Sequence, residues 1–266
     1  MNRRLGIKDY TPKHLASYIE KYRSGLIKTK EIIVSSIVGD IKGKRVLDIG
    51  CGSGVFSNYC YNQGAKVFSL DFSPVMLKFV KQTNPNLNII QASGEDLCFR
   101  NEYFDVILAL DVIEHLYKPK QLLKEISRTL KRNGTTLLIT PNTRVFPASK
   151  LFSLIYSRIL YMIFKSLPRA RARTHKCMHV KEYSADEMEH FLRHAYFRIL
   201  TYDTFSSVPL FNIADKLMSM FFRGPLKKYK WNSVYFYVEK GGRRDKVDVN
   251  FVQKRKQKNY LLKAKS

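Results

Sequence analysis

The chain has 266 residues, of which 45% are hydrophobic, enough for one large domain with a full core or one domain with a substantial insertion. Lys and Arg number 47 against 22 Asp and Glu, and the formal net charge of +25 implies a polyanionic partner, either nucleic acid or an anionic membrane surface. The four cysteines form no Cys-x-x-Cys pair, which excludes a disulfide framework and a zinc site and is typical of reduced thiols in a cytoplasmic protein.

Two helices are predicted ahead of the first strand, at residues 11–22 and 26–38. A Thr-Pro pair opens the first, as an N-cap followed by a proline at the first helical position. The chain opens with Met-Asn-Arg-Arg-Leu-Gly and no apolar run follows, so we expect no secretory signal. Residues 1–43 are therefore expected to form a helical cover beside the domain that follows.

The chain is organised around a glycine turn. A short apolar strand is predicted at 45–49, glycines follow at alternate positions (Gly50, Gly52 and Gly54), and a helix is predicted at 55–63. Glycine accepts positive φ and lets a ligand approach the backbone, while a helix N-terminus offers free N–H groups. A strand, a glycine turn and a helix start together predict a site at which a ligand contacts backbone.

The spacing of the glycines indicates which ligand. A dinucleotide-binding turn, Gly-x-Gly-x-x-Gly counted from Gly50, needs a glycine at 55, where Val55 stands. The observed pattern is Asp-x-Gly-x-Gly-x-Gly, beginning at Asp48, and it resembles the first motif of the class I S-adenosylmethionine (SAM) methyltransferases. The resemblance implies that Asp48 faces the cationic methionine end of SAM, with Gly50, Cys51 and Gly52 along the cofactor.

A second acidic residue lies where a nucleoside needs one. A strand is predicted at 66–70, and Asp71 follows it, 21 residues after Gly50. An acid at the end of the second strand, about 20 residues after the glycine turn, accepts hydrogen bonds from a ribose diol. We expect Asp71 to hold the ribose and Phe72 to pack on the adenine; the alternative for Asp71 is a helix-entry residue, since Ser-Pro then caps a helix at 74–82.

The next two strands are predicted at 87–91 and 104–110. In the methyltransferase family the loop after the third strand holds the adenine through an acid. Asp96 is the candidate for that role and Glu95 is the alternative. Leu110, the last residue of the fourth strand, is expected beside the cofactor.

Candidate catalytic residues follow the fourth strand. Asp111, Glu114 and His115 stand where the resemblance places the methyl group. His115 is a candidate general base at neutral pH. Alternatively, Mg²⁺ held by Asp111 and Glu114 lowers the pKa of a phenol, or the Glu-His pair is structural. His175 and His179 are the next candidates for a base.

Strands and helices alternate through residues 45–140, which predicts an α/β fold with a doubly wound, mostly parallel, seven-stranded Rossmann-like sheet and ligands at the strand C-termini. A helix at 119–131 should close with Lys131 to Gly134, and a fifth strand should run over 135–140. The family resemblance adds a final antiparallel pair, for which 197–202 and 233–238 are the candidates. A capping box, Ser184-x-x-Glu187, predicts a helix to about residue 195.

An apolar insertion separates the fifth strand from that pair. Residues 145–167 carry one polar stripe and positive charges only, and four basic residues follow, so we predict a helix lying in an anionic membrane interface within an insertion at 145–173. The alternative is a lid over the substrate. A second apolar helix is predicted at 208–222, and residues 241–266 are expected to form a disordered basic tail.

Residues 44–240 as a whole resemble a class I SAM methyltransferase domain. The run Asp111-x-x-Glu114-His115 and the apolar insertion, followed by Thr-His, also resemble the quinone-biosynthesis O-methyltransferases, some of which bind a divalent metal through an acid-x-x-acid-His run. The resemblance implies O-methylation of a small-molecule or lipid-linked acceptor, at the cytoplasmic face of a membrane or in the cytoplasm. Methylation of a sugar hydroxyl or of RNA, and a non-catalytic scaffold with this fold, are the alternatives.

Overall fold

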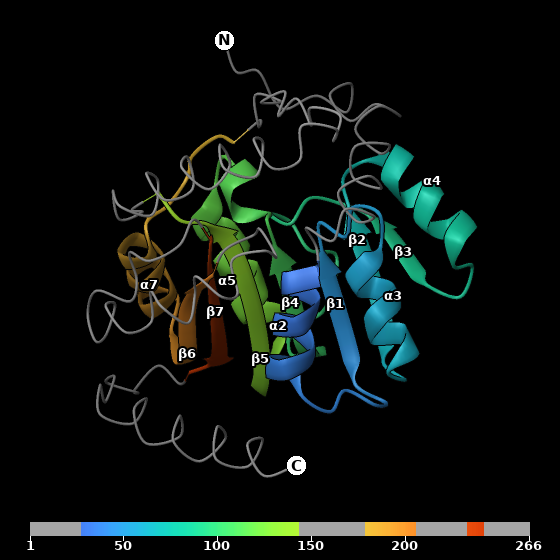
Figure 1. The fold of residues 1–266 in the computed structure, drawn as a ribbon, viewed down its shortest axis with the longest axis horizontal. Coiled ribbons are helices and arrows are strands. Elements are labelled where there is room, and N and C mark those ends of the chain that lie inside the picture. Colours follow the sequence, from blue (N-terminus) through green and yellow to red (C-terminus); the bar gives the residue numbers. More distant parts are fainter. Residues whose placement is uncertain (1–27, 144–178, 206–232, 242–266) are drawn as a thin grey trace, which may run out of the picture.

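The computed structural model describes residues 28–143, 179–205 and 233–241. Seven strands form one sheet in the order β3-β2-β1-β4-β5-β7-β6, and β7 runs antiparallel between β5 and β6 while the other neighbours are parallel (Figure 1). This order confirms the predicted sheet and its final antiparallel pair. The strands are β1 (Arg45–Ile49), β2 (Lys66–Asp71), β3 (Asn88–Gln91), β4 (Phe104–Leu110), β5 (Leu130–Pro141), β6 (Phe197–Phe205) and β7 (Ser233–Lys240).

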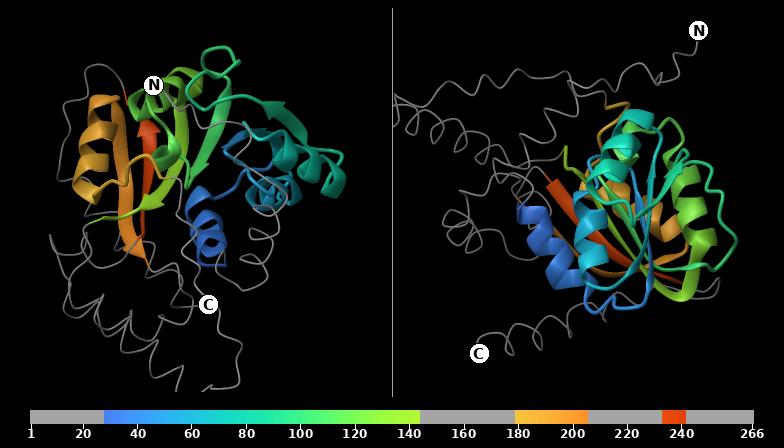
Figure 2. Two further views of the ribbon diagram at one scale, coloured as in Figure 1. Left: turned by 90° about the horizontal axis from the view of Figure 1, so that it is seen from above. Right: turned by 90° about the vertical axis from the view of Figure 1, so that its right-hand side faces the viewer.

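Helices cover both faces of the sheet (Figure 2). Within the described ranges, three helices pack on one face and two on the other, and a short 3-10 turn, η2, follows β4. The helices are α2 (Lys28–Val38), α3 (Val55–Asn62) and α4 (Pro74–Thr83) on one side, and α5 (Pro119–Thr129) and α7 (Ala185–His194) on the other, with η2 at Ile113–His115. The arrangement is the three-layer α/β architecture expected from the alternating sequence pattern.

The two apolar layers of the core come from alternate residues of the same strands. In β4, Val106 and Leu108 pack with α2, α3 and α4, whereas Ile107 and Ala109 pack with α5 and α7. Successive side chains of a strand point to opposite faces, so a strand buried on both faces is apolar throughout. This burial fixes where β1, β2, β4 and β5 end, and the candidate site lies at those ends.

The caps of two helices follow the sequence prediction. Ser73 accepts a hydrogen bond from the N–H of Met76 at the start of α4, and Ser184 and Glu187 form the complete capping box of α7. The predicted end of α5 was wrong. The helix ends at Thr129, and residues 131–134 belong to β5, where the register against β4 shifts by a bulge.

Several predictions fall outside the described residues: the helices at 11–22, 145–167 and 208–222, the insertion at 145–173, His175, and the basic tail except Gly241. The division into 1–43, 44–240 and 241–266 therefore stays a prediction. Among the helices that the structure describes, none has the length and hydropathy to cross a membrane.

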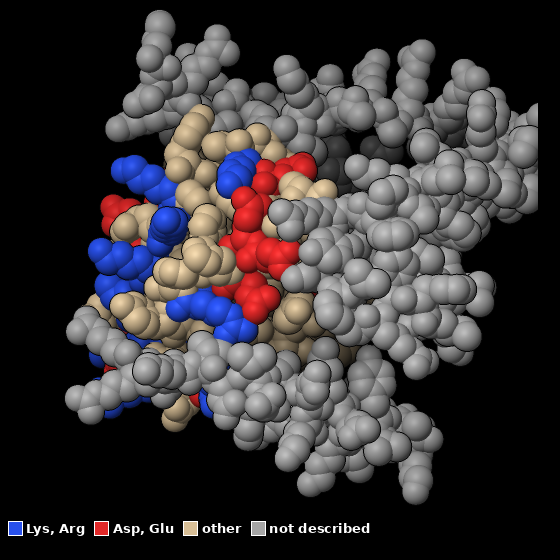
Figure 3. All heavy atoms as spheres, turned by 90° about the vertical axis from the view of Figure 1, so that its left-hand side faces the viewer, with Lys and Arg blue, Asp and Glu red and all other residues tan. Residues whose placement is uncertain are grey.

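The charge of the chain is distributed unevenly. The described ranges contain 19 Lys and Arg against 17 Asp and Glu, so nearly all of the net charge of +25 comes from the remaining residues. On the face that includes α7, acidic side chains form a central group with basic side chains beside it (Figure 3). Any attraction to a polyanion therefore arises mainly from the parts of the sequence outside the described ranges.

Candidate active site

The glycine turn, residues 50–54, joins β1 to α3 at the C-terminal edge of the sheet. Gly50, Gly52 and Gly54 have φ values of +68°, +52° and +77°, a region that other residues rarely adopt. A Cβ added at Gly50 would lie 2.5 Å from a methyl carbon of Val112. Both the backbone conformation and the packing therefore require glycine at the first position of the turn.

Asp71 ties the glycine turn to the end of β2. One carboxylate oxygen accepts a hydrogen bond from the Gly52 N–H at 2.9 Å, and the other accepts one from the Ser73 N–H at 2.8 Å. Burial raises the pKa of this carboxyl, and the backbone donors oppose that shift. Each oxygen keeps a further lone pair, which suits a ribose diol, and Phe72 follows as a half-buried side chain.

Asp48, the penultimate residue of β1, is more deeply buried, with 2% of its surface exposed. The hydroxyl of Ser57 donates to its carboxylate at 2.7 Å, and Ser69 donates in turn to Ser57 at 2.8 Å. Burial raises the pKa of Asp48 to about 7, and it also raises the pKa of the neighbouring Cys51 thiol. A cationic ligand close to the turn would offset the cost of this buried charge.

The glycine turn also contains a buried polar atom without a partner. Among the described residues, the hydroxyl oxygen of Ser53 has no hydrogen-bond partner. Buried polar groups in proteins are almost always paired, so such an atom indicates a missing ligand or water. The structure brings the glycine turn, Asp48 and Asp71 together at the C-terminal ends of β1 and β2, and their contacts with SAM stay a prediction.

The two acids predicted to contact the adenine, Glu95 and Asp96, have different surroundings. The carboxylate of Glu95 accepts a hydrogen bond from the Lys118 N–H at 2.7 Å, which satisfies a donor at the start of α5. Asp96 is exposed, and Leu110 is buried at the end of β4. Of the two acids, only Glu95 accepts this hydrogen bond at the start of α5, so Asp96 stays the first candidate for the adenine.

Glu114 is the most deeply buried acid of the site, at 0% exposure, on η2 after β4. Its Oε2 accepts a hydrogen bond from the Thr140 hydroxyl at 3.1 Å, whereas its Oε1 has no hydrogen-bond partner among the described residues. Burial, and after it the charge of Asp111, raise the pKa of Glu114 to about 8. Thr140, at the end of β5, was not identified from the sequence.

Asp111, whose charge helps to raise the pKa of Glu114, is itself paired with a lysine. Lys30 of α2 forms an ion pair with its carboxylate, and Asp111 itself has a φ of +55°. Sequence analysis did not identify Lys30, because nothing in the chain links α2 to β4 by spacing. One acid of the pair predicted for Mg²⁺ therefore already has a cationic partner.

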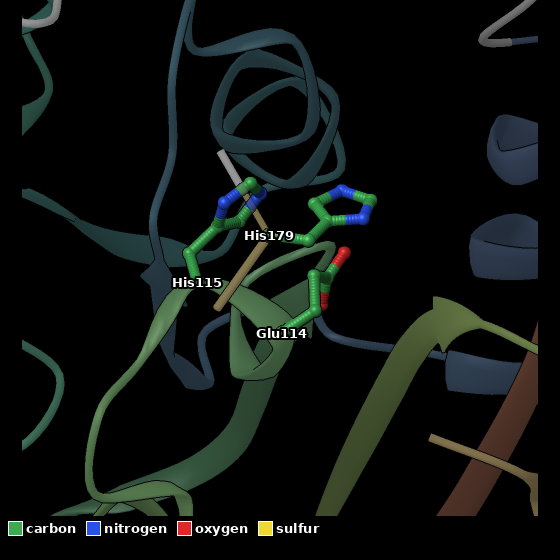
Figure 4. Close-up of side chains that lie close together, drawn as sticks. All are labelled: Glu114, His115 and His179. Carbon is green, nitrogen blue, oxygen red and sulfur yellow. The ribbon is translucent and has the colours of Figure 1, made fainter. Parts of the chain in front are cut away.

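The structure instead brings Glu114, His115 and His179 together, and we call these the Glu-His-His cluster (Figure 4). One potential ligand atom from each lies within 4.8 Å of the others. The two imidazole rings meet edge to face with centroids 4.9 Å apart. His179 was only the next candidate from sequence, because it lies 64 positions after His115 and across the insertion.

Backbone hydrogen bonds hold the segment of His179 against η2. The N–H groups of Val180 and Lys181 both donate to the carbonyl oxygen of Glu114, at 2.8 and 3.2 Å. A carboxylate oxygen of Glu182 lies 2.7 Å from Nδ1 of His179, which orients the ring. The cluster is therefore built from two separate parts of the chain, η2 and the segment of His179, and it can accept a proton or hold a cation at the same edge of the sheet as the glycine turn.

Comparison with known families and proteins shows what the chain is similar to. Residues 47–138 match a family described as "Methyltransferase domain". A ubiquinone biosynthesis O-methyltransferase from Nitrosomonas europaea is 28% identical over 167 residues, covering 61% of this chain and 67% of the relative. The protein of the same name from Azorhizobium caulinodans is 31% identical, covering 55% of this chain and 57% of the relative. The match thus spans between 57% and 67% of the length of these two relatives.

Solved structures share the fold. A SAM-dependent methyltransferase from Archaeoglobus fulgidus superimposes with a TM-score of 0.57 at 18% identity, covering 84% of this chain and 98% of that chain. A SAM-dependent methyltransferase from Mesorhizobium loti gives a TM-score of 0.54 at 17% identity, covering 77% and 94%. At these identities the likeness concerns the fold of the sheet and its helices.

Proposed function

Since this chain belongs to the class I SAM-dependent methyltransferases, we propose that it methylates a hydroxyl oxygen of a small-molecule or lipid-linked acceptor, such as a quinone precursor. One observation carries the proposal: the Glu-His-His cluster lies at the same C-terminal edge of the sheet as the glycine turn. Ligands of open α/β sheets bind at that edge, so the cofactor and the acceptor would meet there.

The cofactor side of the proposal uses the residues around β1 and β2. We assign the methionine end of SAM to Asp48 with Gly50, Cys51 and Gly52, the ribose to Asp71, and the base to Phe72, Asp96 or Glu95, and Leu110. When bound, SAM supplies an electrophilic methyl group on a sulfonium, and transfer breaks the S–CH₃ bond with its electron pair remaining on sulfur. The chain positions the two reactants and excludes water between them.

The acceptor side must remove a proton from the acceptor hydroxyl as the new O–CH₃ bond forms. The residues that we assign to this step are His115, Glu114 and Asp111, with His179 beside them. An imidazole can accept the proton directly, since its ordinary pKa lies near neutrality. A divalent ion at these residues, which the family resemblance suggests as Mg²⁺, would instead lower the pKa of the hydroxyl.

Labelled SAM tests the proposal. The protein is first titrated with SAM by calorimetry, then incubated with methyl-labelled SAM and either a total lipid extract or total RNA. We expect binding of SAM and label in an O-methylated lipid-soluble product. Absence of SAM binding would contradict the function as a whole. Label in RNA would move the acceptor to nucleic acid, and label in a polar glycan would move it to a sugar hydroxyl.

The lipid-linked acceptor rests on two further observations. The relatives named above are ubiquinone biosynthesis O-methyltransferases, and the sequence outside the described ranges holds nearly all of the net charge. We propose that residues 145–173 bind an anionic membrane surface at the cytoplasmic side, where each basic residue contributes about 1 kcal/mol. Full-length protein should co-sediment with anionic liposomes and be released only partly at high salt. Deletion of 149–166 should weaken this binding, and complete release at modest salt would indicate a substrate lid.

A further inference from the structure

We propose that the Glu-His-His cluster binds a divalent transition-metal ion through one carboxylate oxygen and two imidazole nitrogens, and that Asp111 takes no part in that site. The inference deepens the proposed function, and the role of the metal in methyl transfer rests on that function. It departs from an acid-x-x-acid-His arrangement in two respects: His179 joins the site, and Asp111 leaves it.

The donor set decides the class of metal. Two imidazoles and one carboxylate suit Zn²⁺, Fe²⁺ or Co²⁺, whereas Mg²⁺ favours oxygen ligands and retains water. Ligand atoms around a tetrahedral Zn²⁺ stand roughly 3.3 Å apart, given bonds of about 2.0 Å. The three atoms of Glu114, His115 and His179 are already within 4.8 Å of one another, so side-chain rotations suffice to bring them to that spacing.

Two independent features mark Glu114 and His179 as prepared for a ligand. Glu114 is completely buried, and among the described residues its Oε1 has no partner, an arrangement that normally costs free energy unless a cation or donor is added. Nδ1 of His179 lies 2.7 Å from Glu182, which leaves Nε2 for the metal. Carboxylate-histidine-metal triads of this kind orient the imidazole and raise its basicity.

Asp111 is excluded from this site by its partner. The ammonium group of Lys30, itself largely buried on α2, forms an ion pair with the Asp111 carboxylate. A dication near Asp111 would be repelled by that ammonium, whereas a dication between Glu114 and the imidazoles would meet the unpaired oxygen. The arrangement of charges around these residues therefore favours the Glu-His-His cluster over the pair of acids.

Cobalt provides a direct test on the full-length chain. The protein is stripped with a chelator and titrated with Co²⁺, whose visible absorption reports nitrogen and oxygen ligation, and Zn²⁺ is then added in competition. We expect one equivalent of Co²⁺ to bind with a d–d spectrum and Zn²⁺ to displace it. His179→Ala, His115→Ala and Glu114→Gln should each lose this spectrum, and Glu182→Gln should weaken metal binding by about 10- to 100-fold.

Two controls separate this site from others. Asp111→Asn should retain the cobalt spectrum and its stoichiometry. His190→Ala should also retain it, because His190 and His194 form an exposed pair of imidazoles on α7, with rings 3.9 Å apart, that can bind metal adventitiously. SAM titrations of every variant, by calorimetry, establish that the fold and the cofactor site are intact.

The outcomes are distinct. A spectrum lost in Asp111→Asn but kept in His179→Ala would overturn the proposal in favour of the pair of acids. Absence of stoichiometric binding to a chain that binds SAM would also overturn it and leave His115 as a base. A cobalt site in a chain that fails to bind SAM would support the metal site while contradicting the proposed function.

Discussion

The glycine turn and the Glu-His-His cluster occupy one edge of the same sheet, but the buried carboxylates of the two regions, Asp71 and Glu114, differ in how their oxygens are satisfied. In the first, both oxygens of Asp71 accept backbone N–H groups from its own neighbourhood. In the second, Glu114 has one hydroxyl partner and, among the described residues, an unpaired oxygen. The first region is held in shape by the chain itself, whereas the second has capacity left for a proton or a cation. This difference supports our proposal that the first region binds the cofactor and the second takes part in the chemical step.

The largest effect should come from the cluster. His115→Ala removes the group that accepts a proton or ligates an ion, so turnover should fall by about 10²- to 10⁴-fold. SAM affinity should stay near that of the unmodified chain, because the glycine turn is untouched. Steady-state kinetics with the acceptor and calorimetry with SAM measure the two quantities. Undiminished turnover would make His115 structural and end the functional contrast between the regions.

The next effect concerns the rigidity of the glycine turn. Gly50→Ala combines positive φ with a 2.5 Å approach to Val112, whereas Gly39→Ala has positive φ (+70°) and no described atom within 4 Å of the added carbon. We expect Gly50→Ala to lower the free energy of unfolding by about 2–5 kcal/mol and Gly39→Ala by about 1–2 kcal/mol. Denaturant unfolding measures both. Adding Val112→Ala should restore part of the loss at Gly50; equal losses at the two glycines would show that packing contributes nothing.

A smaller effect is expected at the ribose position. Asp71→Ala removes a charged acceptor, so SAM affinity should fall by about 1–3 kcal/mol, which is roughly 5- to 150-fold. Asp105→Ala is the matched control: this acid begins β4 at the other end of the sheet, where it pairs with Lys131 at 2.6 Å. Calorimetry should show unchanged SAM affinity in the control. Similar affinities for both variants would remove Asp71 from the cofactor site.

The smallest effect is a pH dependence at Asp48. Its pKa is raised by burial to about 7, so in the window from the ordinary value near 4 up to 7 the folded chain holds a proton that the unfolded chain has released. Stability contributed by this group therefore falls as pH rises through that window. Asp48→Asn retains an acceptor for Ser57 and lacks the titration, so its stability relative to the parent should increase by about 1 kcal/mol from pH 5 to about pH 6. Denaturant unfolding measures both proteins at the two pH values. An equal stability difference between Asp48→Asn and the parent at both would contradict the raised pKa.

The contrast also explains what could be predicted from sequence. The strands, the glycine turn and the position of Asp71 at the end of β2 depend on local spacing, and the strands, Ser73 and the capping box of Ser184 were predicted close to their observed positions. The end of α5 was mispredicted because Lys131 to Gly134 carries basic residues and a glycine, the usual signals of a helix C-terminus. Pairing with β4 outweighed that local preference and drew these residues into a bulged strand.

The Glu-His-His cluster could not be predicted from local sequence patterns. Glu114 and His115 were candidates because they follow β4, but the partners that define them come from elsewhere: Thr140 from β5, Lys30 from α2, and His179 from the far side of the insertion. No periodicity connects these positions. Their proximity follows only from the three-dimensional packing of segments distant in the chain.

The hydrogen bonds that surround the insertion have a consequence for how this protein can change. Asn142 and Thr143 pair with Tyr183, Asn142 also accepts the N–H of Ala185, and Val180 is bound to the carbonyl of Glu114. The chain leaves the sheet after Thr143 and returns by His179 at fixed points, whatever sequence lies between them. Because the entropy of closing a loop grows only slowly with its length, we expect changes in the length of the intervening sequence to cost little in the geometry of the Glu-His-His cluster. Such a frame lets one set of reactive groups be paired, over evolutionary time or by segment exchange in the laboratory, with different acceptors.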